Sequence, residues 1–192
     1  DGTAAVTVGG DVIISGGILN LKWLAGVATM TVAGDYTQTG GTFNIHSHTA
    51  ATSDTCKVTV NGDFSQTSGT FNFDNAAGTG MAEHTLTLNG ANFTIGGTAS
   101  ITHANNLTTN YIFGQMYFNR SGTTVYSRTA STHTIQHVKQ TIQAWTTVDA
   151  SSSANGFQMT SIASGAAATH TTLTVNGTID MGDKILSSRQ QA

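Results

Sequence analysis

The chain has 192 residues, of which 38% are hydrophobic and only 9% are charged. This hydrophobic content is too high for a disordered chain. The net charge of −3, with seven Lys and Arg in all, argues against nucleic-acid binding. The single cysteine, Cys56, excludes an internal disulfide, and no run approaches the ~20 apolar residues of a membrane span.

A repeated pattern organises the sequence. It consists of a short alternating run, a Gly-Asp corner, an aromatic residue, a second glycine corner and another alternating run. It appears at residues 6–21, 29–45, 57–73 and 85–98. The corner glycines are Gly10, Gly34, Gly62 and Gly90, and the last two intervals between them are equal. A fixed period in this range is characteristic of a solenoid.

The pattern weakens after residue 98 and returns at residues 172–180. The interval from Gly90 to Gly177 is long enough for three coils of nearly the same period. The degenerate coils, between residues 105 and 165, are assigned to residues 111–126, 134–148 and 156–162. The sequence therefore predicts about seven coils of roughly 24–29 residues. They should form one domain that covers residues 1–192.

Alternation assigns the two faces of each strand, because side chains in a strand point to opposite sides with a period of two. An inner column is expected from Tyr36, Phe64 and Phe93, with Val12 and Ile179 in register. The expected outward face consists of Thr7, Thr31, Thr59, Thr87, Thr174, Asn20, Asn44 and Asn72. The expected corners consist of Gly10, Asp11, Gly34, Asp35, Gly62, Asp63, Gly90 and Gly177. Glycine supplies turn conformations there, and Asp or Asn caps the backbone.

These features predict an all-β parallel β-helix, right-handed as most are. A helical fold is excluded because no window carries apolar residues at three-to-four spacing. The variable segments 46–55, 74–83 and 102–110 should form loops along one edge. Repeat motif begins at Val6 and continues at Ile179, so neither end looks capped. An uncapped solenoid is either part of a longer one or stacks end to end.

Two groups of residues have the chemistry of metal ligands. His46 and His48 share one strand face, as do His133 and His137, a spacing that can hold a divalent metal. No carboxylate or thiol is fixed beside them in sequence, so solvated loop histidines are favoured. Asp11, Asp35 and Asp63 should stack at one corner, where calcium is the alternative. Turn capping is favoured there, because the glycine-aspartate nonapeptide of calcium-binding β-rolls is absent. We expect no metal and no cofactor.

No phosphate loop, nucleophile elbow or zinc motif appears. The 10 acidic and 7 basic residues are scattered along the chain, so we expect no catalytic residue and no enzyme. The outward threonines have a different potential, since flat threonine arrays on β-solenoids can order water and bind ice. Lys57 interrupts the second threonine column.

The repeat resembles one known class. Val-Asn-Gly-Asp-Phe-Ser-Gln-Thr-Ser-Gly-Thr-Phe-Asn at residues 60–72 and Gly-Asp-Tyr-Thr-Gln-Thr-Gly-Gly-Thr-Phe-Asn at residues 34–44 look like repeats of very large bacterial surface proteins exported by the type IX route. More loosely, they resemble filamentous-haemagglutinin-like adhesins. The resemblance implies a parallel β-solenoid stalk or fibre at the cell surface, and it brings no catalytic residues. The loss of corner glycines between residues 131 and 154 departs from that pattern.

The leading expectation is a non-catalytic structural protein, extracellular or at the cell surface. It would be a stalk, an adhesin segment or a self-assembling filament subunit that associates end to end or continues into a longer chain. The alternative is a surface-binding module that holds a glycan or ice on its Thr/Asn face. A polysaccharide-acting enzyme that uses Asp35 or Asp63 comes third.

Overall fold

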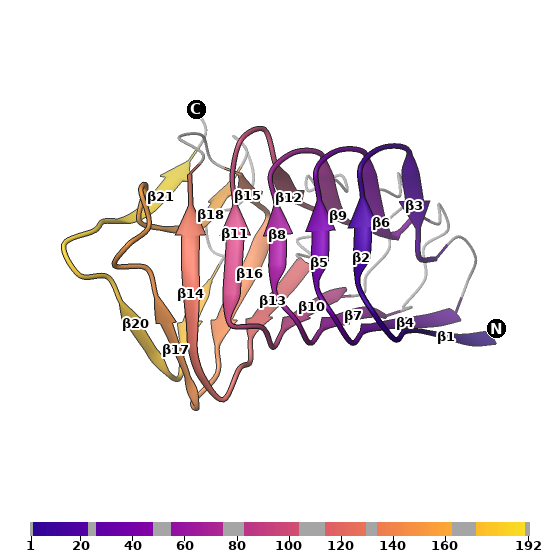
Figure 1. The fold of residues 1–192 in the computed structure, drawn as a ribbon, viewed down its shortest axis with the longest axis horizontal. Coiled ribbons are helices and arrows are strands. Elements are labelled where there is room, and N and C mark those ends of the chain that lie inside the picture. The colour runs from indigo at the N-terminus through magenta and orange to yellow at the C-terminus, as the bar shows by residue number, and fades with distance from the viewer. Residues whose placement is uncertain are drawn as a thin grey trace.

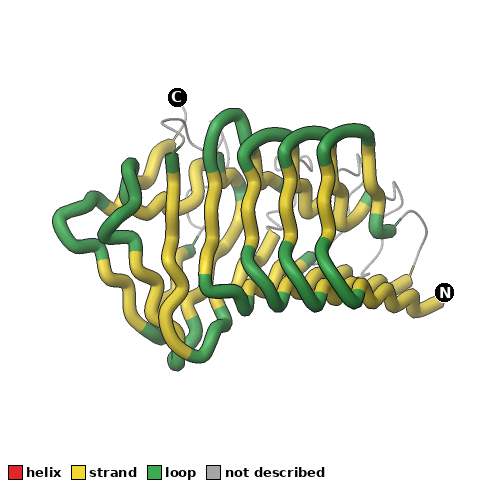
Figure 2. The backbone as a smooth tube through the Cα atoms, viewed as in Figure 1, coloured by secondary structure: helices red, strands yellow, loops and turns green. Residues whose placement is uncertain are grey.

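The protein is an all-β parallel β-solenoid, as the sequence predicts (Figure 1). The computed structural model describes residues 2–22, 26–47, 55–74, 83–103, 114–129, 134–162 and 172–190. These residues form strands and the turns that join them, with no helix among them and hence none that could cross a membrane (Figure 2). The handedness of the coils stays a prediction.

The strands of the described residues form three parallel sheets of seven strands each. Sheet A contains β1 (Gly2–Val8), β4 (Gly26–Val32), β7 (Cys56–Val60), β10 (Thr85–Leu88), β13 (Gly114–Phe118), β16 (Val138–Ile142) and β19 (Leu173–Val175). Sheet B contains β2 (Val12–Ile14), β5 (Tyr36–Gln38), β8 (Phe64–Gln66), β11 (Asn92–Ile95), β14 (Gly122–Arg128), β17 (Thr146–Asp149) and β20 (Thr178–Asp180). Sheet C contains β3 (Ile18–Asn20), β6 (Thr42–His46), β9 (Thr70–Asp74), β12 (Ser100–Thr102), β15 (Ile135–Gln136), β18 (Phe157–Ile162) and β21 (Leu186–Gln190).

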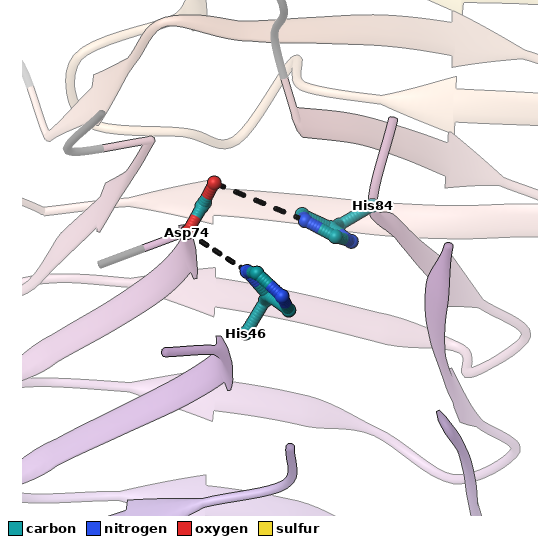
Figure 3. Close-up of side chains that lie close together, drawn as sticks. All are labelled: His46, Asp74 and His84. Carbon is teal, nitrogen blue, oxygen red and sulfur yellow. Dashed lines mark hydrogen bonds and ion pairs between the residues drawn. The ribbon is translucent and has the colours of Figure 1, made fainter. Parts of the chain in front are cut away.

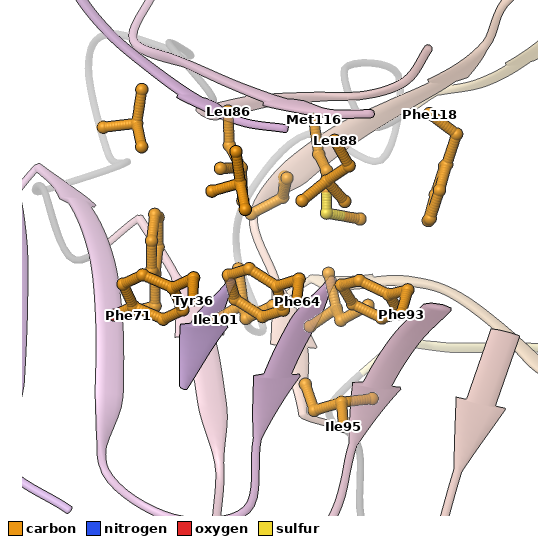
Figure 4. Packing of buried hydrophobic residues seen from close by; sticks show 14 of the residues in the cluster. Tyr36, Phe64, Phe71, Leu86, Leu88, Phe93, Ile95, Ile101, Met116 and Phe118 are labelled. Atoms are coloured by element: carbon orange, nitrogen blue, oxygen red, sulfur yellow. The ribbon is translucent and has the colours of Figure 1, made fainter. Parts of the chain in front are cut away.

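The interior is apolar and is built around an aromatic column (Figure 4). Tyr36, Phe64, Phe93 and Tyr126 occupy equivalent places in successive strands of sheet B, with ring centroids 4.9, 5.3 and 5.2 Å apart. Stacked aromatic rings at this spacing add attraction beyond the burial of their area. Because the sheets are parallel and in register, each coil places the same kind of side chain over that of its neighbour.

The expected place of Ile179 in that column is wrong. Ile179 pairs with Val148, which pairs with Thr124, two residues before Tyr126 in β14. Strand β14 begins ahead of Val125, the residue that pairs with the start of β11. When a coil has extra residues before its aromatic position, the spacing measured in the early repeats no longer locates the equivalent residue in later coils. The period alone therefore misplaces Ile179.

The coils between Gly90 and Gly177 differ in length, where the sequence predicted three of nearly equal length. The residues that end the successive strands of sheet A pair in register, and they are Leu88, Phe118, Ile142 and Val175. The middle interval of this series is the shortest and the last is the longest. Residues 134–142, assigned from the sequence to a single coil, instead contribute β15 to sheet C and β16 to sheet A of the next coil. His137 separates the two strands, and its φ of 55° turns the chain within a single residue.

Two kinds of glycine corner join the strands of a coil. At Gly62, between sheets A and B, an added Cβ atom would lie 2.5 Å from the carbonyl of Gly34 in the preceding coil. At Gly69, between sheets B and C, the backbone has a φ of 78°, which glycine adopts readily and other residues rarely do. Gly62 has no positive φ. Glycine is therefore needed at Gly62 for the close approach of two coils, and the turn conformation expected there is found at Gly69.

Candidate functional site

The threonine column of sheet A has fewer gaps than the sequence indicated. Its positions pair in register across all seven strands, and they are Thr7, Thr31, Thr59, Thr87, Tyr117, Thr141 and Thr174. Only Tyr117 departs from threonine. The neighbouring column of sheet A is mixed. In successive strands it contains Thr29, Lys57, Thr85, Gln115 and Lys139. The column therefore carries a hydroxyl-bearing side chain in each of its seven strands.

The asparagine column does not offer an open surface. Asn44 and Asn72 are only 2% and 3% exposed, so the expectation of a solvent-facing asparagine column is wrong for these two residues. Their side chains form a ladder, in which Asn44 donates to Asn20 at 2.7 Å and Asn72 donates to Asn44 at 3.3 Å. Buried amide groups need such partners, and identical residues in stacked strands provide them.

The corner aspartates cap the backbone. The carboxylate of Asp11 accepts the N–H of Asp35 at 2.8 Å, and that of Asp35 accepts the N–H of Asp63 at 2.8 Å. Asp63 in turn accepts the N–H of Asn92 at 2.9 Å. Each carboxylate therefore joins one coil to the next, which is the capping role favoured from the sequence. Calcium binding at this column stays untested.

The two terminal coils expose residues that belong to the solenoid interior. Val6 and Leu19 are 44% and 41% exposed, although they pair with Met30 and Phe43, which are buried. A hollow of about 130 Å³ opens between them. At the other end Val175 pairs with the buried Ile142 but is itself 45% exposed. Among the described residues, the apolar interior is thus open at both ends.

A polar cluster lies inside the solenoid, where sheet C ends and sheet A begins (Figure 3). His46 ends β6 and Asp74 ends β9, and the two residues pair in register. His84 directly precedes β10 in sheet A. Nδ1 of His46 lies 3.0 Å from one oxygen of Asp74, and Nε2 of His84 lies 4.0 Å from the other. The two imidazole rings stack with centroids 4.7 Å apart.

These three side chains are almost completely buried, since each residue is only 2% exposed. Nδ1 of His84 accepts a hydrogen bond from the backbone N–H of Cys56 at 3.1 Å, which fixes the orientation of its ring. Each of the three offers one ligand atom, and these atoms all lie within 4.8 Å of one another. Among the described parts of the chain, this is the one group of three or more such residues with that geometry.

Burial keeps the nearby histidines neutral. Loss of hydration lowers the pKa of His84 to about 3, an effect that the charge of His46 reinforces and Asp74 opposes. Loss of hydration also lowers the pKa of His103 to about 4, again against the attraction of Asp74. A neutral imidazole keeps a lone pair for a metal ion or a hydrogen bond. The cluster therefore has the chemistry of a ligand set at neutral pH.

The interpretation of His46 as a solvated loop residue is wrong, because its side chain is buried at the end of β6. His48 and His133 lie outside the described residues. The period of the early coils contains the signal that sequence reasoning missed, since His46 and Asp74 are one period apart, as are Cys56 and His84. The period places these residues at equivalent positions of adjacent coils. It does not show that the ends of sheet C and the starts of sheet A meet.

Comparisons with protein-family models, with curated proteins and with solved structures gave no match for this chain.

Proposed function

We propose that this chain is a non-catalytic structural protein whose coils stack end to end into a filament. The observation that carries the proposal is the exposure of interior residues at both ends of the solenoid. Val6, Leu19 and Val175 lie in register with buried residues of the adjacent coil. One further coil on either side, from a longer chain or from a second copy, would bury them.

A second copy of the chain fits this role. The outer strands of the terminal coils, β1 to β3 and β19 to β21, each present one edge without a partner strand in the described structure. Such edges are templates for pairing with another chain. Head-to-tail stacking would continue all three parallel sheets and place apolar side chains over apolar side chains. The contact is heterologous, so it extends into a fibre and does not close into a dimer.

Electron microscopy and sedimentation of the purified chain test the proposal. We expect unbranched fibres with an axial strand spacing of about 4.8 Å. A double variant, Leu19→Asp with Val175→Asp, places charge on both ends and should give single rods. Thr87→Asp is the matched control, because it adds a charge of the same sign on the outward face of a central strand. A folded wild-type chain that stays monomeric at high concentration would refute end-to-end assembly.

We propose an extracellular or cell-surface location for this filament. The support is the resemblance of its repeat to those of large bacterial surface proteins, together with the low content of charged residues. Antibody labelling of intact cells of the source organism tests the location. Labelling that requires permeabilised cells would contradict it.

A second function, binding of a glycan or an ice surface, is favoured by one observation. The hydroxyl column of sheet A continues through Thr141 to Thr174, beyond the place where the sequence pattern weakens. Replacing Thr59 and Thr87 with tyrosine should abolish inhibition of ice recrystallisation or glycan binding without affecting fibre formation. A wild-type chain inactive in both assays would remove this function.

A further inference from the structure

We propose that His46, Asp74 and His84 bind one divalent transition-metal ion inside the solenoid. Two imidazoles and one carboxylate converge there from two sheets, with their ligand atoms within 4.8 Å of one another. In a tetrahedral site the ligand atoms lie roughly 3.4 Å apart, given metal–ligand distances of about 2.1 Å. The 3.0 Å and 4.0 Å separations from Asp74 bracket that value. Small side-chain rotations would therefore complete the site.

His103 provides a second, independent observation. It follows β12 in sheet C, its side chain is 1% exposed, and neither of its ring nitrogens has a hydrogen-bond partner. The carboxylate of Asp74 lies close enough to act on its charge. A buried imidazole without partners is costly, and a metal ion would provide one. His103 is not in the group whose ligand atoms lie within 4.8 Å of one another, so it would have to move to become a fourth ligand.

The donor set selects the class of metal. Imidazole nitrogen suits Zn²⁺, Ni²⁺, Co²⁺ and Cu²⁺, whereas Ca²⁺ and Mg²⁺ prefer six or more oxygen ligands. Burial away from water also favours a closed structural site over a catalytic one, which would keep an open position. The ion would join the end of sheet C to the start of sheet A, on either side of residues 75–82. Its role would be to hold this corner of the solenoid together.

Loading has a structural signature at Cys56. Without a metal ion, the backbone N–H of Cys56 donates to Nδ1 of His84. The ring proton of His84 therefore resides on Nε2, the nitrogen that faces Asp74. Binding a metal through Nε2 moves that proton to Nδ1, and the hydrogen bond from Cys56 is lost. The amide signal of Cys56 should therefore shift on loading.

Lys22 is the group that opposes a cation here. It lies in the coil before His46, since the backbone N–H of Ser47 donates to the carbonyl of Lys22. Its side chain is 6% exposed, and its charge acts on His84. Replacing Lys22 with methionine keeps a similar length and removes the charge. Lys22→Met should therefore bind the metal more tightly than the wild-type chain.

The test is titration of the full chain with ZnCl₂ after treatment with EDTA. Isothermal calorimetry should give one ion per chain, with a higher melting temperature that EDTA reverses. Asp74→Asn and His84→Gln should lose more than about 100-fold in affinity, because losing a direct ligand costs more than losing its outer partner. Asp35→Asn, a carboxylate of the corner column, is the control and should bind as wild type does.

Cobalt(II) binding to the wild-type chain gives a second test, which stays informative even if the variants do not fold. The wild-type chain with one equivalent of Co²⁺ should show the visible absorption bands of a four-coordinate nitrogen and oxygen site. Absence of saturable binding, or binding that Asp74→Asn and His84→Gln leave unchanged, would overturn the proposal. Fibre formation in EDTA is scored separately, because end-to-end stacking does not depend on the metal.

Discussion

Gly114 in β13 is predicted to contribute to stability because it makes room for the ring of Phe73. A Cβ atom added at Gly114 would lie 2.3, 2.5 and 2.7 Å from three carbons of that ring. Real contacts are never so short, so either the ring or the strand must shift. The ring is itself held edge-on against Phe71, with centroids 5.6 Å apart. Movement of Phe73 therefore disturbs the aromatic core.

The expected cost of Gly114→Ala is the difference of two effects. Overpacking of a filled core costs about 1–3 kcal/mol. The φ of Gly114 is not positive, so alanine also gains about 0.5–1 kcal/mol through the smaller entropy of the unfolded chain. The net loss in the free energy of unfolding should be about 1 kcal/mol, within the range of about 0–2.5 kcal/mol that the two effects allow. Urea unfolding followed by far-ultraviolet circular dichroism measures it.

Two variants make this prediction refutable. Gly9→Ala is the control, since a Cβ there meets nothing within 4 Å, and it should cause no loss of stability. Phe73→Ala removes Cγ, Cδ1 and Cδ2, the atoms that the new methyl group would strike. In a double-mutant cycle it should recover about 1 kcal/mol of the loss from Gly114→Ala. Equal stability of Gly114→Ala and Gly9→Ala, or additive losses in the cycle, would refute the steric argument.

Three further predictions concern a corner aspartate, the response to acid and a turn. Asp35→Ala should cost about 1 kcal/mol, because it removes the acceptor of the Asp63 N–H, whereas Asp35→Asn keeps an acceptor and should cost a few tenths, as thermal unfolding can show. In EDTA, the free energy of unfolding should fall from about pH 6.5 down to pH 3–4. In this range His84 and His103 are protonated in the unfolded chain but stay neutral in the folded chain, because burial lowers their pKa. The free energy of unfolding therefore falls by up to about 1.4 kcal/mol per pH unit for each histidine. Urea titrations at pH 7 and pH 5 that give equal stability would contradict this. His137→Val should lose more than about 1 kcal/mol relative to His137→Asn in the same titration, because a β-branched residue resists a φ of 55°.

The architecture could be predicted because its determinants are local. Alternation of Val58, Thr59 and Val60 defines two faces within one strand, and a glycine at a fixed spacing ends it. Repetition then places each strand beside its equivalent, so the parallel sheets follow from the period. The same reasoning failed for Ile179, because residues added in one coil shift the numbering of every later strand. It also failed for Asn44, since direction within a strand does not determine exposure.

The polar cluster could not be predicted because it depends on where two sheets meet. His46 and Asp74 lie at the end of sheet C, and His84 lies at the start of sheet A. Ten residues separate the end of β9 from the start of β10, so no sequence spacing shows that Asp74 and His84 face each other. Strand alternation also does not assign a direction to a side chain at a corner.

The corner between sheets C and A is where this solenoid tolerates variation. The connection there is five residues long after β3, ten after β9 and eleven after β12, yet the strands on either side keep their parallel register. After β15 the connection shrinks to His137 alone. Polar or ionisable residues recur at this corner in Lys22, His46, Asp74, His103 and His137, whereas the other inner positions are mainly apolar. A corner that can change length without disturbing the sheets can also change chemistry without disturbing them. That property is the physical reason to look for a specific ligand at this corner, while the repeated faces serve assembly.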